Sequence, residues 1–159
     1  FMPSLVSDLG VLERQLHQAR QGAIQAELTA AGLQEVGHPM LLCVLGITGE
    51  QHPDAPVRTQ RELARLLHVS PAAVTTSLQS LERKGYILRE PGDGDARCNR
   101  VLLTDKGRQA VKDCLACLQR VSRRMYAGFT TEEQAIMRSF YLRMLDNLPP
   151  THSCGHSSK

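Results

Sequence analysis

Residues 95–107 read DARCNRVLLTDKG, and this stretch decides the fold of the chain. It opens with a charged turn containing Arg97, continues as a short apolar strand, and ends where Thr104 can cap a helix. Residues 86–90, YILRE, have strand composition too, and the intervening PGDGD at 91–95 is rich in turn residues. Together these segments predict a β-hairpin with an arginine at its tip.

Two short helices precede the hairpin. Ser70 is a good N-cap, and the proline after it suits the first position of a helix that we expect over 71–84. Gly85 can adopt the left-handed conformation that ends such a helix. Residues 59–62, TQRE, form a capping box for an earlier helix, which ends at the short turn His68-Val69. Two helices joined by a tight turn and followed by a hairpin are the pattern of a winged helix-turn-helix.

Longer helices flank this unit. Residues 4–31 repeat apolar side chains at alternating steps of four and three, the spacing of a helix–helix seam. We expect a second helix over 39–48, ended by Gly46 and Gly49, and two more over 104–127 and 130–148. The apolar positions of the flanking helices are Leu5, Leu9, Leu12, Leu16, Ala19 and Ala23 in the first, Val111, Leu115, Leu118, Val121 and Met125 in the third, and Ile136, Phe140, Met144 and Leu148 in the last.

The predicted fold class is therefore mostly α with a small β-hairpin wing, a winged helix-turn-helix combined with a helical dimerisation region. The expected divisions are 4–48 for N-terminal helices that serve dimerisation and core, 56–107 for the DNA-binding region, and 108–148 for C-terminal dimerisation helices. A polar tail over 149–159 is expected to be disordered. The terminal seams are too long for one chain to cover, which favours a homodimer; the alternative is that these helices pack on each other within one chain.

Composition narrows the class of protein. Hydrophobic residues make up 42% and charged residues 22% of the 159, which is typical of a globular chain. No apolar run is long enough to span a membrane, and the N-terminus lacks a secretion signal, so we expect a cytoplasmic protein. Five scattered cysteines fit reduced thiols. We find no phosphate loop, metalloprotease motif or nucleophile elbow, so no enzyme is predicted.

The charge distribution points to double-stranded DNA. Residues 58–107 hold nine lysines or arginines against six acids, an excess of three that equals the net charge of the whole chain. Helix 71–84 would enter the major groove and wing 91–100 the minor groove. The residues expected to contact bases are Ser70, Ala72, Ala73, Thr75, Thr76, Ser77 and Gln79, those expected at phosphates are Arg83 and Lys84, and those expected from the wing are Arg97 and Arg100.

The chain resembles the multiple-antibiotic-resistance regulator (MarR) family. The resemblance lies in Glu62-Leu63-Ala64, Val74-Thr75, residues 81–85 (LERKG) and the pattern Asp95-x-Arg97 followed by Val101-x-Leu103-Thr104-x-x-Gly107. It implies a homodimer whose first and last helices interlock, a pseudo-palindromic DNA site, and repression relieved by a small ligand or by oxidation. Many members carry an arginine where this chain has Thr76, so the wing would supply more of the DNA contact.

The signal to which such a regulator responds is less defined. By the resemblance, a small-molecule effector would lie between the dimer helices and the winged region, near His17, Arg20, Met40, Cys43 and Leu115. Cys98 beside Arg97, or the pair Cys114 and Cys117 on one helix face, could instead sense oxidants or a metal. Each has a plainer alternative, a surface thiol for Cys98 and core side chains for Cys114 and Cys117, and Cys43 is expected in the core.

We expect no cofactor and no dedicated metal site, because no second pair of ligands accompanies the two cysteines at zinc spacing. The tail residues His152, Cys154 and His156 could bind zinc or copper only weakly. A different function on the same fold is a winged-helix module that binds only protein. Replacing Arg97 would distinguish it, because such a module has no DNA affinity to lose.

Overall fold

The computed structural model describes residues 8–51, 60–91 and 99–149, and within them the chain forms six helices and a two-stranded antiparallel sheet. The predicted fold class is confirmed. In chain order the elements are α1 (Leu9–Ala30), α2 (Pro39–Gln51), α3 (Gln60–Leu67), α4 (Pro71–Arg83), β1 (Ile87–Pro91), β2 (Asn99–Leu103), α5 (Asp105–Met125) and α6 (Thr131–Asn147).

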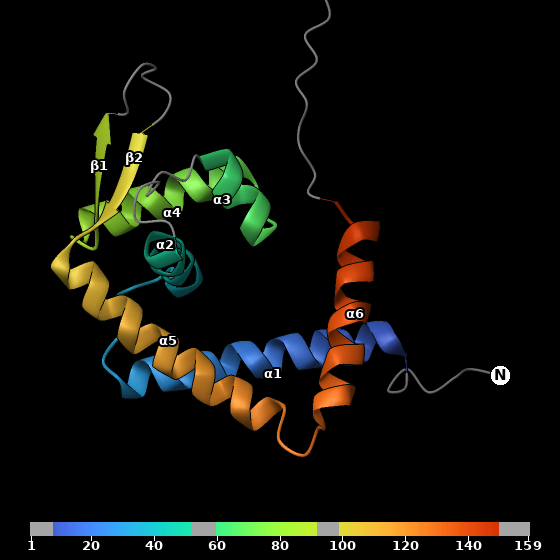
Figure 1. Cartoon of the computed structure of the whole chain (residues 1–159). Coiled ribbons are helices and arrows are strands. Elements are labelled where there is room, and N and C mark those ends of the chain that lie inside the picture. The colour runs from blue at the N-terminus through green and yellow to red at the C-terminus, as the bar shows by residue number, and fades with distance from the viewer. Residues whose placement is uncertain (1–7, 52–59, 92–98, 150–159) are drawn as a thin grey trace, which may run out of the picture.

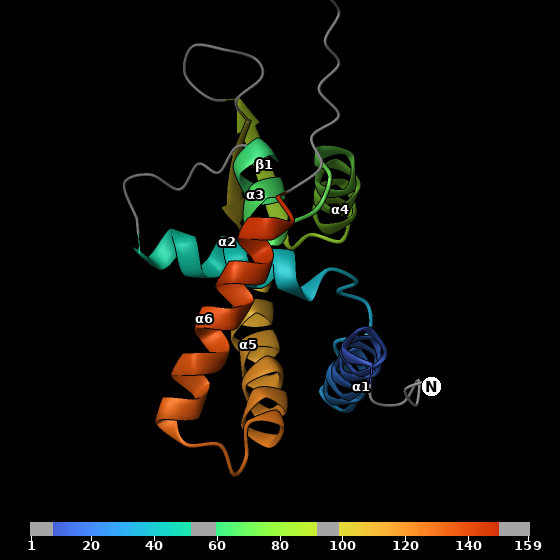
Figure 2. The same cartoon turned by 90° about the vertical axis from the view of Figure 1, so that its right-hand side faces the viewer.

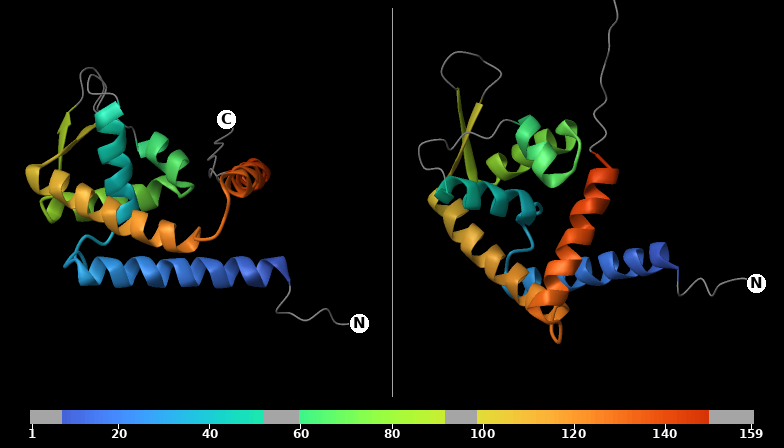
Figure 3. Two further views of the ribbon diagram at one scale, coloured as in Figure 1. Left: turned by 60° about the horizontal axis from the view of Figure 1, so that its bottom comes forward. Right: turned by 45° about the vertical axis from the view of Figure 1, so that its right-hand side comes forward.

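The elements form two layers around a central helix. Helix α2 lies between α5 on one side and the α3–α4 pair on the other, and the hairpin rises beside α4 (Figure 1). Helices α1 and α5 run side by side along the opposite edge of the molecule (Figure 3). Helix α6 follows α5 after a tight bend and stands apart from the hairpin end of the molecule (Figures 1 and 2).

The core is built almost entirely from aliphatic side chains and cysteines. Helix α2 is apolar on most of its surface, as expected of a helix that is covered on several sides. It packs on α5, α3 and β2, and so it connects the long helices to the winged part of the fold. The most buried side chains are Val36, Leu42, Leu63, Val74, Leu78, Leu81, Ile87, Cys114 and Cys117.

Local capping signals place most helix ends. Ser70 accepts from the amide of Ala73, Thr104 from that of Gly107, and Thr130 with Glu133 completes a reciprocal capping box. The turn between α3 and α4 contains His68 with a φ of 57°, and Gly85 ends α4 with a φ of 83°. These observations confirm the sequence reading of both turns. Thr59, the predicted cap of α3, lies outside the described residues.

Two predicted helix bounds were wrong. The first helix begins at Leu9, not at residue 4, because Asp8 has an extended backbone and its carboxylate caps Gly10. The second helix continues through Gly46 and Gly49 to Gln51. Glycine costs a helix interior only about 1 kcal/mol relative to alanine, and at Gly46 the packing requires it. A Cβ there would lie 2.5 Å from Cγ1 of Val111 on α5.

The hairpin pairs in one continuous antiparallel register, with Ile87 opposite Leu103 and Glu90 opposite Arg100. Ile87 and Val101 point into the core, whereas Leu88 is exposed. The tip at residues 92–98 lies outside the described residues, and with it Arg97, Cys98 and the acids beside them. The two strands nevertheless confirm the hairpin that residues 86–103 predicted.

The buried face of α5 differs from the predicted stripe. It is centred on Ala110, Val111, Cys114, Cys117 and Val121, whereas Leu115, Leu118 and Met125 are only partly buried. The face shifts because α5 packs against both α1 and α2, so small side chains fill the middle of the contact.

The apolar seams of the first and last helices are largely uncovered. Leu9, Leu12 and Leu16 are exposed on α1, and α6 has no buried residue. The predicted face of α6 leaves Ile136, Phe140, Met144 and Leu148 between 49% and 70% exposed. Within the described residues, packing inside one chain therefore does not bury these seams.

Candidate nucleic-acid interface

Helix α4 presents one face to the core and the opposite face to solvent. Val74, Leu78 and Leu81 are at most 1% exposed. At 100° per residue, the side directly opposite carries Ala72, Thr76, Gln79 and Arg83, and all four are exposed. We call these four residues the α4 outer stripe. Its spacing is that of a helix face able to lie along a groove.

Two of the residues predicted at the DNA, Thr75 and Ser77, lie off this stripe and form hydrogen bonds to other parts of the chain. The hydroxyl of Thr75 lies 3.0 Å from the carbonyl oxygen of Pro71 and 3.1 Å from Oε1 of Gln60, so it ties α4 to α3. Ser77 is partly buried, and its Oγ lies 3.1 Å from Nδ1 of His38, just before α2. Both side chains therefore hold α4 in position. Sequence reasoning treated all polar residues near the helix start alike, because their directions depend on the packing of α4.

His38 is the polar support behind the recognition helix. Partial burial lowers the pKa of its imidazole below the usual 6.5, and the nearby Lys84 ammonium lowers it further. A neutral ring can either donate to or accept from the Ser77 hydroxyl. The sequence analysis did not assign His38 to the DNA-binding site, and the signal that could have found it is its place directly before Pro39, at the start of α2.

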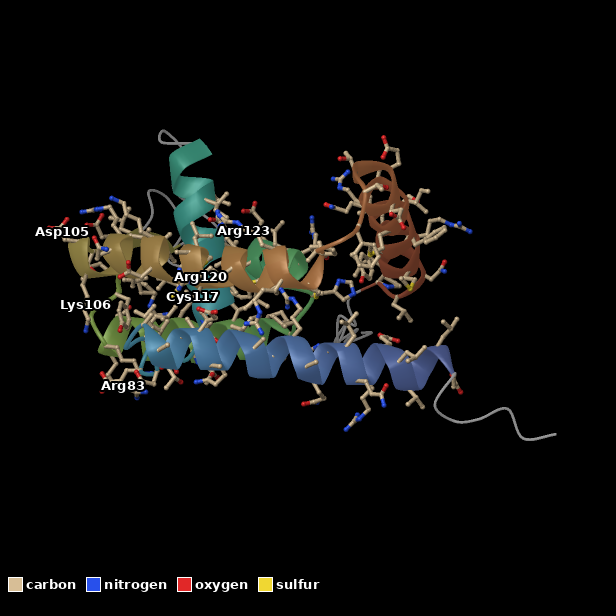
Figure 4. The ribbon with its side chains drawn as sticks, turned by 90° about the horizontal axis from the view of Figure 1, so that it is seen from below. Arg83, Asp105, Lys106, Cys117, Arg120 and Arg123 are labelled. Carbon is tan, nitrogen blue, oxygen red and sulfur yellow. The ribbon has the colours of Figure 1, made fainter. Side chains whose placement is uncertain are left out.

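The base of the wing is joined firmly to the end of α4. Thr104 Oγ1 donates to the Gly85 carbonyl at 2.6 Å, and Lys106 Nζ donates to the Lys84 carbonyl at 2.8 Å. The same ammonium lies 4.5 Å from the centre of the Tyr86 ring, a cation–π contact. Figure 4 shows Lys106 at the start of α5 near Arg83 at the end of α4. The hairpin and the recognition helix therefore form one structural unit.

The close packing of Gly107 explains why the pattern Leu103-Thr104-x-x-Gly107 ends in a glycine. The first turn of α5 passes so close to β1 that a Cβ on Gly107 would lie 2.0 Å from the carbonyl oxygen of Tyr86. Only glycine permits that approach.

Exposed arginines lie on the outer stripe and on the neighbouring helix α3. Arg61 and Arg65 on α3 and Arg83 on α4 are exposed, and in the part of the chain that the structure describes they form no ion pair. Arg89, by contrast, is neutralised by Glu82 with an Nε–Oε2 distance of 2.5 Å. Lys84 is half-buried beside Gly37 and His38. Arg97 lies outside the described residues, and of Arg100 only the strand backbone is described.

The expected effector residues do not gather around one cavity. His17 and Met40 are exposed, Arg20 is half-buried and Cys43 is buried in the core. Leu115 alone of the five lines a cavity of about 630 Å³ between α2, β2 and α5. Its apolar walls include Leu45, Val101 and Val111, and two cations that the sequence analysis missed, Arg108 and Lys112, also line it. Arg108 is engaged with Asp105 and with the carbonyl of Leu103.

The two cysteines of α5 face different neighbours. Cys117 Sγ lies 3.6 Å from the carbonyl oxygen of Glu27 on α1 and 3.3 Å from Nη2 of Arg120. Arg120 Nε also pairs with the Glu27 carboxylate at 2.8 Å. Figure 4 shows Cys117 and Arg120 on the side of α5 that faces α1. Cys114 is buried, and its interaction with the Cys43 thiol of α2 lowers the pKa of the Cys114 thiol. Among the described residues no group of three side chains is arranged to hold a metal ion.

A helix pair with an exposed outer stripe and a two-stranded wing beside it defines a winged helix-turn-helix protein. The sequence profile of the MarR family matches residues 40–97. The resemblance to this family that was read from the sequence motifs is therefore confirmed.

Known proteins similar to this chain are transcriptional regulators. The uncharacterized HTH-type regulator YdgJ of Bacillus subtilis is 31% identical over 90 residues, 57% of this chain and 55% of YdgJ. The chain spans about half the length of the curated relatives it matches. The regulator PA3341 has a structure 28% identical, with a TM-score of 0.68, covering 89% of this chain and 98% of that one. The Staphylococcus aureus MepR–DNA complex is 26% identical, with a TM-score of 0.71, covering 91% and 99%.

Within the described ranges, no helix combines the length and the apolar character that crossing a bilayer requires.

Proposed function

We propose that this chain regulates transcription by binding double-stranded DNA, with α4 in the major groove and the wing over 91–100 in the minor groove. The α4 outer stripe carries the proposal, because an exposed helix face with free cations beside it fits a groove flanked by phosphates. Among the described residues, Arg83 of this stripe and Arg61 and Arg65 of α3 form no ion pair. Gln79 offers an amide for base edges, and the Thr76 hydroxyl, which donates to the Ala72 carbonyl, can still accept. The similarity to MepR, whose structure is a DNA complex, supports DNA binding by this chain.

The DNA-binding form is a homodimer of this chain. Its support is the exposed apolar surface of α6 and of the first half of α1, which is larger than a monomer in water normally leaves uncovered. A two-fold axis between the copies would place two α4 helices on one side of the duplex, facing consecutive half-sites. That geometry matches a pseudo-palindromic operator. The wing cations, Arg97 and Arg100, would then contact the flanking minor grooves.

We propose repression relieved by a small effector as the mode of regulation. Its support is the resemblance to the MarR family and the cavity between α2, β2 and α5, which has apolar walls and a few polar side chains, as small-molecule sites do. The structure of CouR from Rhodococcus jostii, 20% identical with a TM-score of 0.71, contains bound p-coumaroyl-CoA. This ligand is that of CouR and is not assigned to the present chain. The relatives are regulators, which favours regulation over catalysis for this chain.

DNA binding is tested by fluorescence anisotropy on the promoter fragment upstream of the chain's own gene and on a mixed-sequence duplex. Arg83→Ala and Arg97→Ala should each weaken binding, and the dependence of log K on log salt should fall by about one if the arginine meets a phosphate. Arg123→Ala is the control, because it removes one charge from the far end of α5. Equal losses in all three variants would contradict the placement of the DNA on α4 and the wing. No DNA binding by the parent chain would leave the protein-only module as the better interpretation.

The dimer is tested by sedimentation at micromolar concentration. Phe140→Asp places a charge in the exposed face of α6 and should yield monomers, whereas Leu88→Asp, at an equally exposed apolar site on β1, should not. A monomeric parent chain would contradict the dimer.

A further inference from the structure

His68 lies in the turn between α3 and α4, and its backbone has the left-handed conformation, with a φ of 57°. Among the residues that the structure describes, it is the one residue other than glycine with a positive φ. A Cβ makes this conformation costly, and glycine adopts it without that cost. The reason for a histidine at this position therefore lies in its side chain.

Two other helix ends in the same chain show which residue this turn favours. After α3, the amides of His68 and Val69 donate to carbonyls of the last turn of the helix at 3.3 Å and 3.0 Å. This pair of bonds is a Schellman motif, in which the left-handed residue is usually glycine. The same pair of bonds ends α1 at Gly32 and ends α4 at Gly85. Three equivalent helix ends thus contain two glycines and one histidine.

The imidazole of His68 reaches the C-terminal end of α6. Its Nε2 lies 2.5 Å from the carbonyl oxygen of Leu148, which is 80 residues away in the sequence and is the C-cap of α6. A carbonyl oxygen can only accept, so the ring donates from Nε2. The last carbonyls of a helix have no partner within the helix, and the ring supplies one for α6. This end of α6 approaches the α3–α4 pair in Figure 1 and in the right-hand view of Figure 3.

This hydrogen bond joins the helix-turn-helix to a helix that packs little on its own chain. In the described part of the chain α6 has no buried residue, so the burial of side chains does not fix its direction. The turn that contains His68 leads after two residues to Ser70, the N-cap of α4. The bond between His68 and Leu148 therefore fixes the start of α4 relative to the end of α6.

We propose that His68 is a positioning residue for DNA binding, whose ring fastens the turn of the helix-turn-helix to α6 and so sets the spacing between the two α4 helices of the dimer. The functional part of this inference rests on the proposed DNA-binding homodimer, whereas the hydrogen bond itself does not. Consecutive half-sites lie about 34 Å apart on one side of the duplex. One extra base pair moves a half-site by about 3.4 Å and turns it by about 35°, so two α4 helices at a fixed spacing no longer fit both half-sites.

Two variants separate the hydrogen bond of the ring from the conformation of the backbone. His68→Gly removes the donor but suits the left-handed turn, so the chain should remain folded, which thermal unfolding verifies. His68→Gln keeps an N–H donor at a similar distance from its Cα and keeps the strained conformation as well. If His68 served only the local fold of the turn, glycine would be the harmless replacement. The proposal expects the opposite order, with positioning lost in His68→Gly and kept in His68→Gln.

The hydrogen bond is tested first, without DNA, by NMR spectra that correlate the amide protons and nitrogens of the full chain. The resonances of residues 145–148, the last turn of α6, should shift in His68→Gly and stay near those of the parent in His68→Gln. The resonances of residues 131–134, the first turn of the same helix, are the internal control and should not move in either variant. Unchanged resonances at 145–148 in His68→Gly would overturn the bond between the turn and α6.

The spacing is then tested by fluorescence anisotropy on a duplex that the parent selects from a randomised pool, and on the same duplex with one base pair inserted between its half-sites. The insertion should weaken binding about tenfold for the parent and for His68→Gln, but only about twofold for His68→Gly. Equal losses in the parent and His68→Gly, or no loss in the parent, would overturn the positioning role. If the parent binds no duplex, the proposed function fails, while the NMR spectra still decide whether the bond to α6 exists.

Discussion

Gly107→Ala should destabilise the fold severely for so small a change. The added methyl would lie 2.0 Å from the carbonyl oxygen of Tyr86 and 3.0 Å from its carbon, both backbone atoms that no side-chain rotation can move. Cβ contacts shorter than 3.0 Å are essentially never found, so the start of α5 and the start of β1 would have to separate by about 1 Å. That carbonyl accepts the Thr104 amide at 3.1 Å, and the separation would strain this bond.

The separate contributions to the change in unfolding free energy can be compared. Overpacking of this kind costs about 3 kcal/mol, at the upper end of the usual range. A weakened hydrogen bond adds about 1 kcal/mol, and the better helix propensity of alanine returns about 1 kcal/mol. The net loss of about 3 kcal/mol corresponds to a melting temperature lower by roughly 6–12 °C for a domain of this size.

The assay is thermal unfolding followed by circular dichroism, with all proteins at one concentration because a dimer melts in a concentration-dependent way. Gly22→Ala is the matched control, since Gly22 lies within α1 and a Cβ there would meet nothing within 4 Å. It should raise the melting temperature by about 2–4 °C through helix propensity alone. A Gly107→Ala protein that melts with or above the parent would refute the close-approach argument.

Three further changes follow from the same structure. Ser70→Ala removes the N-cap of α4 and should lower the unfolding free energy by about 1 kcal/mol in a urea titration, more than Ser80→Ala later in the same helix. Gly46→Ala should destabilise the parent by about 1–2 kcal/mol but a Val111→Ala background by less, because the clash is with the Val111 side chain; additive losses would contradict the contact. Because the native pKa of His38 lies below that of the unfolded chain, the unfolded state protonates first, and the parent should lose unfolding free energy as the pH falls from about 7 through 6.5. The difference in unfolding free energy between the parent and His38→Gln should therefore change with pH over that window. Unfolding free energies that run parallel for the two proteins would contradict the burial of the imidazole.

Much of the fold could be predicted because its signals are local. The serine and threonine caps at residues 70, 104 and 130, the left-handed Gly85 and the strand pair around the wing each depend on residues within a few positions of one another. The glycines within α2 led the prediction to end this helix too early. The low helix propensity of Gly46 can be read from the local sequence. The packing that requires a glycine there comes from Val111, about sixty-five residues away.

The candidate site was predicted in outline and altered in detail. The sequence placed the recognition helix over 71–84 and its buried residues correctly, since the positions of Val74, Leu78 and Leu81 on the helix follow from its period alone. It could not show that Ser77 faces His38 or that Thr75 joins Gln60. Those directions depend on which sides of α4 are covered by other elements.

By itself, then, the sequence determined the class of this protein, because helix caps, apolar periods and the hairpin pattern act between near neighbours in the chain. The tertiary structure alone decided which distant residues meet: Gly107 against the Tyr86 carbonyl, His38 against Ser77 of α4, and Gly46 against Val111. Such contacts depend on how α2, α4 and α5 cross, and a crossing is set by the packing of whole helix faces.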